Sequence, residues 1–181
     1  MSNSTAKRVL KLGIKANTIT VIAFVIGVLA SVLVYVDFPW LGIAFLWLSG
    51  FLDTVDGAMA RMTETSPFGT VLDVTFDRIV EIGIFVALGL RYPEAAFPLL
   101  VLCCAIIISM TVFLTVGAVA EKKGMKSFYY QAGVAERTEG FIMSTLMVVL
   151  PQYIVILTYI YAGLVAFTAL QRFMEAKKIL S

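Results

Sequence analysis

Long apolar stretches separated by short polar segments recur along the whole chain. A transmembrane helix needs about 20 mostly apolar residues, because each residue rises about 1.5 Å through a hydrocarbon core about 30 Å thick. Proline-containing turns at residues 37–39 and 91–94 mark two of the breaks between stretches. The pattern predicts spans at residues 19–36, 40–61, 69–90, 97–120, 132–150 and 153–173. We therefore expect an all-α integral membrane protein with six transmembrane helices, folded as a single membrane domain over residues 1–181.

A basic segment precedes the first predicted span. Residues 5–15 mix apolar side chains with the cations Lys7, Arg8, Lys11 and Lys15. This composition suits a short amphipathic helix that lies on an anionic membrane surface. A basic tail that only sets the topology would have the same composition. The apolar run that follows is longer than that of a signal peptide and lacks a cleavage site, so we expect the segment to be retained.

The distribution of positive charge predicts the orientation in the membrane. Lysine and arginine near the ends of spans are retained on the cytoplasmic side. With the six predicted spans, the cations at span ends fall on one side, and Arg91 is the exception. Both termini are therefore expected to be cytoplasmic.

Composition excludes several classes of protein. Of the 181 residues, 60% are hydrophobic and 14% are charged, too few polar residues to cover a water-exposed globule. A net charge of +2 without a basic block gives no reason to expect a nucleic-acid partner. The absence of histidine excludes Ser-His-Asp and Cys-His hydrolases and His-ligated zinc. Cys103 and Cys104 are adjacent in an apolar run, so they provide no disulfide framework.

An unusual cluster of charged residues interrupts the second and third predicted spans. A charge that faces lipid at mid-depth costs at least about 2.5 kcal/mol, so several together must face protein or water instead. The members of the cluster are Asp53, Asp56, Arg61, Asp73, Asp77, Arg78 and Glu81. Arg78 and Glu81 have a helical spacing that favours a simple ion pair.

Helical spacing predicts that the four aspartates face one another. Asp53 and Asp56 are three residues apart on the second span, and Asp73 and Asp77 are four apart on the third. Four converging carboxylates repel one another unless cations lie between them, and two divalent ions would balance their charge. Ligation by oxygen alone favours Mg²⁺, Mn²⁺ or Ca²⁺ over zinc, with Mg²⁺ the natural choice.

Two such ions are the usual clamp for displacement at phosphorus, so the cluster predicts phosphoryl chemistry. Gly57, Ala60 and Gly69 on the same faces would let a base or pyrophosphate approach the backbone closely. Small residues in membrane helices more often serve helix packing, but their place beside the acids favours ligand contact here. Arg61 would be available to bind phosphate.

The segment DTVDGAMARMTETSPFGTVLDVTFD, residues 53–77, resembles the signature DxxDGxxAR followed by GxxxDxxxD of the CDP-alcohol phosphotransferases. All eight fixed positions match, with seven residues between Arg61 and Gly69. The Asn-x-x-Thr sequence that begins at Asn17 is similar to the start of the first span in that family. The resemblance implies a homodimeric membrane enzyme that moves a substituted phosphate, most naturally phosphatidyl from CDP-diacylglycerol, to the hydroxyl of a small alcohol and releases CMP.

The resemblance also implies a role for each matched residue. Asp53, Asp56 and Asp73 would bind two Mg²⁺ or Mn²⁺ ions, and Asp77 would bind a metal and act as the general base. The CDP-binding residues would be Asp56, Gly57, Ala60, Arg61 and Gly69.

The acceptor is less well defined by the sequence. Lys126 and Arg137 lie on the expected catalytic side, where they would bind a phosphate on the acceptor or only set the topology. Ala135, Glu136 and Arg137 are similar to the AER stretch of members that use inositol phosphate. Those members also share a RARAE stretch, and residues 117–121 here read GAVAE. Glycerol phosphate, serine, inositol phosphate and other small alcohols are all compatible with the sequence.

Two other functions would also use acidic residues within membrane helices. Magnesium-dependent membrane prenyltransferases also use aspartate-rich motifs around a diphosphate, but they need about nine spans and place those motifs far apart in sequence. A divalent-cation transporter would carry acids along a path open to both sides, whereas here the non-cytoplasmic half has charge only near its rim. Both alternatives predict that CDP-diacylglycerol yields no CMP.

Overall fold

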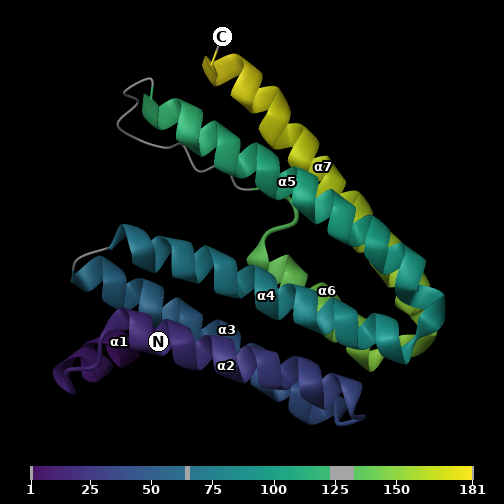
Figure 1. Cartoon of the computed structure of the whole chain (residues 1–181), viewed down its shortest axis with the longest axis horizontal. Coiled ribbons are helices and arrows are strands. Elements are labelled where there is room, and N and C mark those ends of the chain that lie inside the picture. The colour runs from purple at the N-terminus through teal and green to yellow at the C-terminus, as the bar shows by residue number, and fades with distance from the viewer. Residues whose placement is uncertain (1, 64–65, 123–132, 181) are drawn as a thin grey trace. The chain divides into compact units, whose positions relative to one another are not determined.

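The computed structural model describes residues 2–63, 66–122 and 133–180, and over these residues it is helical, without β-strands (Figure 1). The helices divide into two compact units, Met1–Arg91 and Tyr92–Ser181. The prediction of an all-α protein is confirmed. The description of the chain as a single membrane domain stays a prediction.

The first unit contains α1 (Ser2–Lys11), α2 (Ala16–Tyr35), α3 (Pro39–Met62) and α4 (Pro67–Arg91). Helix α2 packs against both α3 and α4. Small residues allow this packing, since a Cβ built on Gly27 of α2 would lie 2.5 Å from Cγ2 of Val80 and 2.8 Å from Oγ of Ser49. The Ser49 hydroxyl donates a hydrogen bond of 2.7 Å to the carbonyl oxygen of Ala23. Close approach through small and hydroxyl residues is typical of helices packed within membranes.

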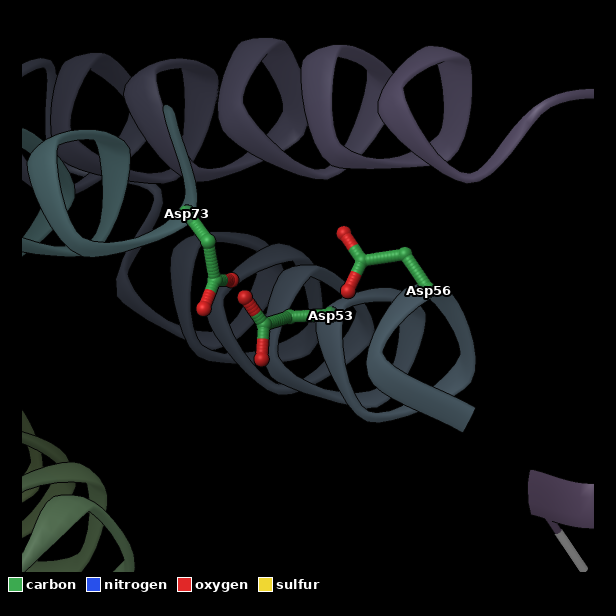
Figure 2. Close-up of side chains that lie close together, drawn as sticks. All are labelled: Asp53, Asp56 and Asp73. Carbon is green, nitrogen blue, oxygen red and sulfur yellow. The ribbon is translucent and has the colours of Figure 1, made fainter. Parts of the chain in front are cut away.

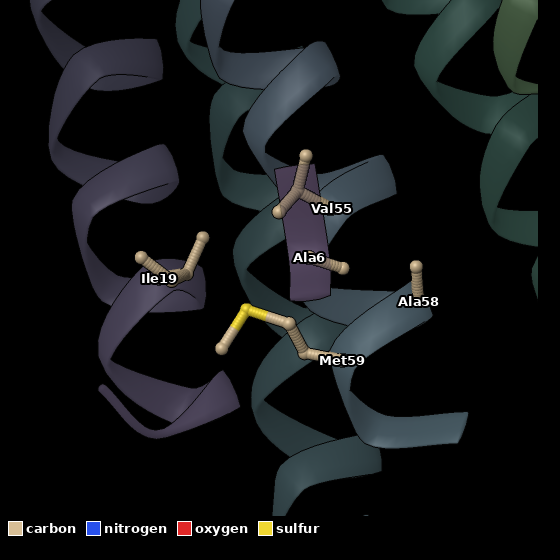
Figure 3. Close-up of a cluster of buried hydrophobic side chains, with 5 residues drawn as sticks. All are labelled: Ala6, Ile19, Val55, Ala58 and Met59. Atoms are coloured by element: carbon tan, nitrogen blue, oxygen red, sulfur yellow. The ribbon is translucent and has the colours of Figure 1, made fainter. Parts of the chain in front are cut away.

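Helix α1 packs against α3. Ala6 is fully buried in a cluster with Ile19 of α2 and with Val55, Ala58 and Met59 of α3 (Figure 3). The sequence predicted a helix at residues 5–15, whereas α1 ends at Lys11 and is followed by Gly13 with φ +74°. Glycine adopts this left-handed conformation at little cost, so the chain turns there and enters α2 at Ala16. A position of α1 on the membrane surface stays a prediction.

The turn between α2 and α3 is joined to the C-terminal end of α4. Asp37, in this turn, has φ 68°, a conformation that aspartate tolerates better than most residues. Arg91 forms an ion pair with Asp37 and donates a hydrogen bond of 3.1 Å to the carbonyl oxygen of Val34. The one cation expected at the non-cytoplasmic rim thus has a structural role.

The second unit begins with η1 (Pro93–Ala95) and α5 (Ala96–Lys122). It continues with α6 (Arg137–Val149), η2 (Pro151–Tyr153) and α7 (Ile154–Leu180). Helix α7 packs against both α5 and α6. Pro151 separates α6 from α7, as the sequence predicted.

By length and composition, four helical segments of the described chain are apolar enough to cross a membrane: Ala16–Tyr35, Pro39–Met62, Pro93–Val119 and Pro151–Lys178. These four helices make the chain an integral membrane protein. Two of the six predicted spans differ from this pattern. Helix α4 carries four residues of the charged cluster, Asp73, Asp77, Arg78 and Glu81. Helix α6 has only 13 residues, and the expected start of that span at residue 132 lies outside the described residues. The number of six spans stays a prediction.

Candidate metal and phosphate site

Three of the four predicted aspartates come together in the first unit. Asp53 and Asp56 lie one turn apart on α3, so they share a face, and Asp73 lies on α4. One carboxylate oxygen from each lies within 4.8 Å of one from each of the other two. Figure 2 shows the three side chains pointing toward one another. Asp56 is buried, with 4% of its surface exposed, and Asp53 and Asp73 are half-buried.

This spacing suits a hard divalent cation. Oxygen ligands lie about 2.1 Å from Mg²⁺ and about 2.4 Å from Ca²⁺, so two oxygens on opposite sides of one ion are about 4.2 to 4.8 Å apart. The three carboxylates are already within that range of one another. Like charges at this distance repel, most strongly for the buried Asp56, and a cation between them would remove the repulsion. The triad therefore has the chemistry and the spacing of a metal site.

A pocket of about 90 Å³ lies beside Asp56 and Asp73. Three helices of the first unit form its wall. The lining residues are Ala16, Asn17, Thr20, Asp56, Gly57, Ala60, Ser66, Gly69, Thr70 and Asp73. Pockets that enclose a whole cofactor-sized ligand are about 300–1,000 Å³, so this one suits a single group of a larger ligand.

The start of α4 forms one side of the pocket. The backbone N–H of Gly69 donates a hydrogen bond of 2.9 Å to Oγ of Ser66, which precedes the helix. A Cβ on Gly69 would lie 2.8 Å from that oxygen and 3.0 Å from Oδ1 of Asn17. Glycine therefore keeps this wall open. The positive end of the α4 dipole lies at the same place and favours an anionic ligand such as phosphate.

Arg61 lies close to the face of α3 that lines the pocket. It is exposed, and a Cβ on Gly57 would lie 3.4 Å from its Nη1 atom. The guanidinium thus extends past Gly57, which lines the pocket together with Ala60. The predicted CDP-binding residues Asp56, Gly57, Ala60 and Gly69 line one pocket, and Arg61 lies beside it.

Asp77 is placed differently from the other three aspartates. Within the described part of the chain, the group that could hold a metal consists of Asp53, Asp56 and Asp73. Asp77 lies four residues beyond Asp73 on α4, which is about 6 Å further along the helix axis. Three of the four predicted carboxylates form this group, and a metal-binding role for Asp77 stays a prediction. The predicted ion pair between Arg78 and Glu81 is confirmed.

The two predicted acceptor residues belong to the part of the chain that follows Arg91. Lys126 lies outside the described residues. Arg137 begins α6, and its guanidinium lies 5.7 Å from the centre of the Phe141 ring. Glu136 precedes it, and its side chain takes part in a capping box with Glu139. The structure thus places Arg137 at the start of a well-capped helix.

Sequence reasoning missed several polar residues of the pocket. Thr20, Ser66 and Thr70 line it, and none was assigned a function. Ser66 stands directly before Pro67, and a serine followed by proline is a typical helix start, so this signal was present. Thr20 is the threonine of the Asn-x-x-Thr sequence and donates a hydrogen bond of 3.2 Å to the carbonyl oxygen of Ala16.

Comparison with known proteins identifies a matching family. Residues 14–171 match the sequence model of the CDP-alcohol phosphatidyltransferases. An archaetidylinositol phosphate synthase of Pyrococcus horikoshii is 40% identical over 85 residues, 46% of this chain and 45% of the relative. A phosphatidylinositol phosphate synthase of Mycobacteroides abscessus is 30% identical over 79% of this chain and 66% of the relative. The chain thus spans less than two thirds of the length of each of these two relatives.

Solved structures share the fold. The phosphatidylinositol phosphate synthase of Mycobacterium tuberculosis with CDP-DAG bound has a TM-score of 0.78 at 20% identity, covering 97% of this chain and 93% of that one. The same enzyme in complex with manganese and citrate has a TM-score of 0.74 at 22% identity, covering 97% and 88%. At 20% and 22% sequence identity, these two matches establish a shared fold and nothing further.

Proposed function

Because the chain belongs to the CDP-alcohol phosphatidyltransferase family, we propose that it transfers a phosphatidyl group from a CDP-linked lipid to a small polar alcohol and releases CMP. The observation that carries the proposal is the meeting of Asp53, Asp56 and Asp73 beside a pocket lined by the small residues of the same motif. The reaction would serve phospholipid synthesis. CDP-diacylglycerol is the donor that we propose.

Two divalent cations, Mg²⁺ or Mn²⁺, are the cofactors that we propose. The binding of manganese by the mycobacterial enzyme supports this assignment. Asp53, Asp56 and Asp73 would hold the cations, with Asp77 as a further ligand. Bound there, the cations would neutralise the diphosphate and the developing charge on the leaving CMP.

The chain's own residues would perform the remaining tasks. The pocket would receive part of the CDP group, with Gly57 and Gly69 permitting close approach to the backbone. Arg61 would bind a phosphate of the donor, since its guanidinium extends past Gly57. Asp77 would accept the proton of the attacking hydroxyl, because an alcohol is a weak nucleophile at neutral pH.

Arg137, with Lys126, would bind the acceptor. Its place in an Ala-Glu-Arg sequence at the start of α6 supports a phosphate on the acceptor, as do the names of the relatives, which are synthases of inositol phosphate lipids. The sequence GAVAE at residues 117–121 lacks the two arginines shared by enzymes that use inositol phosphate. Inositol phosphate, glycerol phosphate and serine are therefore the acceptors to compare.

We propose that the chain spans the membrane six times, with α1 on the cytoplasmic surface. Both termini and the aspartate triad would then be cytoplasmic, as the distribution of cations predicts. Cysteine-accessibility labelling tests this orientation, with single cysteines introduced at Ser4 and Tyr92 in a variant whose Cys103 and Cys104 are replaced by alanine. We also propose a homodimer, which the mass of the purified protein in nanodiscs would test.

The decisive experiment is a CMP-release assay. Purified protein in nanodiscs would be given CDP-diacylglycerol, Mn²⁺ or Mg²⁺, and each of the three labelled acceptors in turn. We expect CMP and one labelled lipid product in equal amounts, and no product with EDTA. A prenyltransferase or a cation transporter would release no CMP under any of these conditions, and that result would refute the proposal.

A further inference from the structure

The segment at residues 133–137, which leads into α6, is fixed to the middle of α7 by one hydroxyl group. The backbone N–H of Ala135 donates a hydrogen bond of 2.9 Å to Oγ1 of Thr168. The Thr168 hydroxyl in turn donates a hydrogen bond of 3.0 Å to the carbonyl oxygen of Leu164. Thr168 is fully buried, with 0% exposure. The hydrogen bond to Leu164 thus orients the Thr168 hydroxyl to accept a hydrogen bond from the segment. Because Thr168 is buried, water does not compete for this bond.

The shape of the segment is also matched to this threonine. A Cβ built on Gly133 would lie 2.1 Å from Cγ2 of Thr168 and 3.2 Å from its Oγ1. No side chain fits between them, so glycine is required for the segment to lie against α7 at this point. The methyl group of Thr168 occupies the space in front of Gly133, and its hydroxyl makes the hydrogen bond to the segment.

A second contact holds the same segment one turn further along α7. Oε1 of Glu136 accepts a hydrogen bond of 2.7 Å from the backbone N–H of Gly133 and lies 3.7 Å from Nη2 of Arg172. Arg172 also lies over the ring of Phe113, 5.0 Å from its centre. Glu136 is the N-cap residue of α6, so these contacts fix where that helix begins.

We propose that Thr168 is a positioning residue that sets the place of Arg137 for binding the acceptor. Arg137 is the first residue of α6 and directly follows Glu136, so its backbone is held by the contacts of Ala135 and Glu136 with α7. Thr168 itself is fully buried and acts through the segment. The inference rests on the proposed function, because it requires that Arg137 binds the acceptor.

The test compares three variants by steady-state kinetics, with donor and acceptor varied separately. Thr168→Val keeps the shape and loses the hydroxyl, Thr168→Ser keeps the hydroxyl, and Thr158→Val is the matched control. Thr158 is also fully buried on α7, and its hydroxyl donates to Ile154 of the same helix and contacts Met147. Thermal unfolding of each variant accounts for general loss of stability, which both valine variants should share.

We expect Thr168→Val to raise the acceptor KM about threefold to tenfold, the effect of one lost hydrogen bond. The donor KM and kcat at saturating acceptor should stay within about twofold of wild type, and Arg137→Ala should show the same pattern more strongly. Thr168→Ser and Thr158→Val should leave the acceptor KM unchanged. Equal effects of Thr168→Val and Thr158→Val, or equal changes in both KM values, would overturn the inference.

A paired substitution tests the inference even if Thr168→Val does not fold. Gly133→Ala should raise the acceptor KM, because its methyl group overlaps Cγ2 of Thr168. Adding Thr168→Ser removes Cγ2 and retains the hydroxyl, so the double variant should recover most of the lost acceptor affinity. Failure to recover would refute the positioning role. A wild-type protein that releases no CMP would instead refute the proposed function.

Discussion

Asp56 of α3 and Asp73 of α4 place carboxylate oxygens within 4.8 Å of each other, and the helix that packs against both of their helices is α2. The distance between the two carboxylates is therefore set largely by how α2 fits against its two neighbours. That fit depends on Gly27, where a Cβ would come within 3.0 Å of both Val80 of α4 and Ser49 of α3. We therefore expect Gly27, in the interior of α2, to influence the geometry of the candidate metal site.

Gly27→Ala should weaken both the fold and the metal site. The added methyl group would lie 2.5 Å and 2.7 Å from the two γ-carbons of Val80, a stiff β-branched side chain that cannot rotate away freely. Forcing a methyl group into a filled space costs about 1–3 kcal/mol. Thermal unfolding and Mn²⁺ calorimetry would measure the two effects. The double variant Gly27→Ala, Val80→Ala should recover part of both, and an unchanged Mn²⁺ affinity in Gly27→Ala would contradict the role of α2.

Asp56→Asn should lower the affinity for Mn²⁺ at least tenfold. The carboxylate of Asp56 is the buried member of the triad, and asparagine offers a neutral oxygen in the same place. Even indirect partners of metal ligands change affinity by about 10- to 100-fold. Calorimetry with Mn²⁺ in the absence of donor isolates this effect. Asp37→Asn is the control, because Asp37 lies in the turn between α2 and α3 and asparagine tolerates its positive φ.

Asp77→Asn should separate metal binding from turnover. Asp77 lies outside the group of three aspartates that the described structure brings together, so Mn²⁺ affinity should fall far less than in Asp56→Asn. Loss of a general base lowers turnover by about 10²- to 10⁴-fold. CMP release and Mn²⁺ calorimetry on the same preparation would show the difference. Near-normal turnover would remove Asp77 as the base, and equal losses of metal in both variants would show that Asp77 contributes as much to metal binding as Asp56 does.

The aspartate triad was predictable because helical periodicity acts over a few residues of one chain. Asp53 and Asp56 had to share a face of any helix that contained both. Asp73 was expected to point toward them, because a charge that faces lipid is costly. The pairing of Arg78 with Glu81 followed from the same local rule. Asp77 was included by its spacing from Asp73, but the group of three carboxylates leaves it out, because spacing along one helix does not specify the distance of each residue from a neighbouring helix.

The features that were not predictable depend on contacts between segments distant in sequence. The burial of Ala6 against Val55 and Met59 joins the first helix to the third, and no local pattern in residues 5–15 specifies that contact. The hydrogen bond from Ala135 to Thr168 likewise links two segments 33 residues apart. Thr168 looks like an ordinary threonine in an apolar helix until the structure places its partner beside it.

Gly69→Ala should weaken donor binding without unfolding the protein. The added methyl group would lie 2.8 Å from Oγ of Ser66 and 3.0 Å from Oδ1 of Asn17, and both are ends of side chains that can rotate. Their movement would cost little stability, but it would shift two polar atoms into the pocket and disturb the hydrogen bond from Gly69 to Ser66.

We expect a severalfold rise in the KM for CDP-diacylglycerol in Gly69→Ala, with the acceptor KM unchanged, as separate titrations of the two substrates would show. Gly163→Ala is the matched control, because Gly163 is an exposed glycine of α7 with no atom within 4 Å of the added Cβ. Alanine favours a helix by up to about 1 kcal/mol over glycine, so this control should be as stable as wild type or more so. If both variants bind the donor like wild type, the pocket beside the triad does not receive the CDP group.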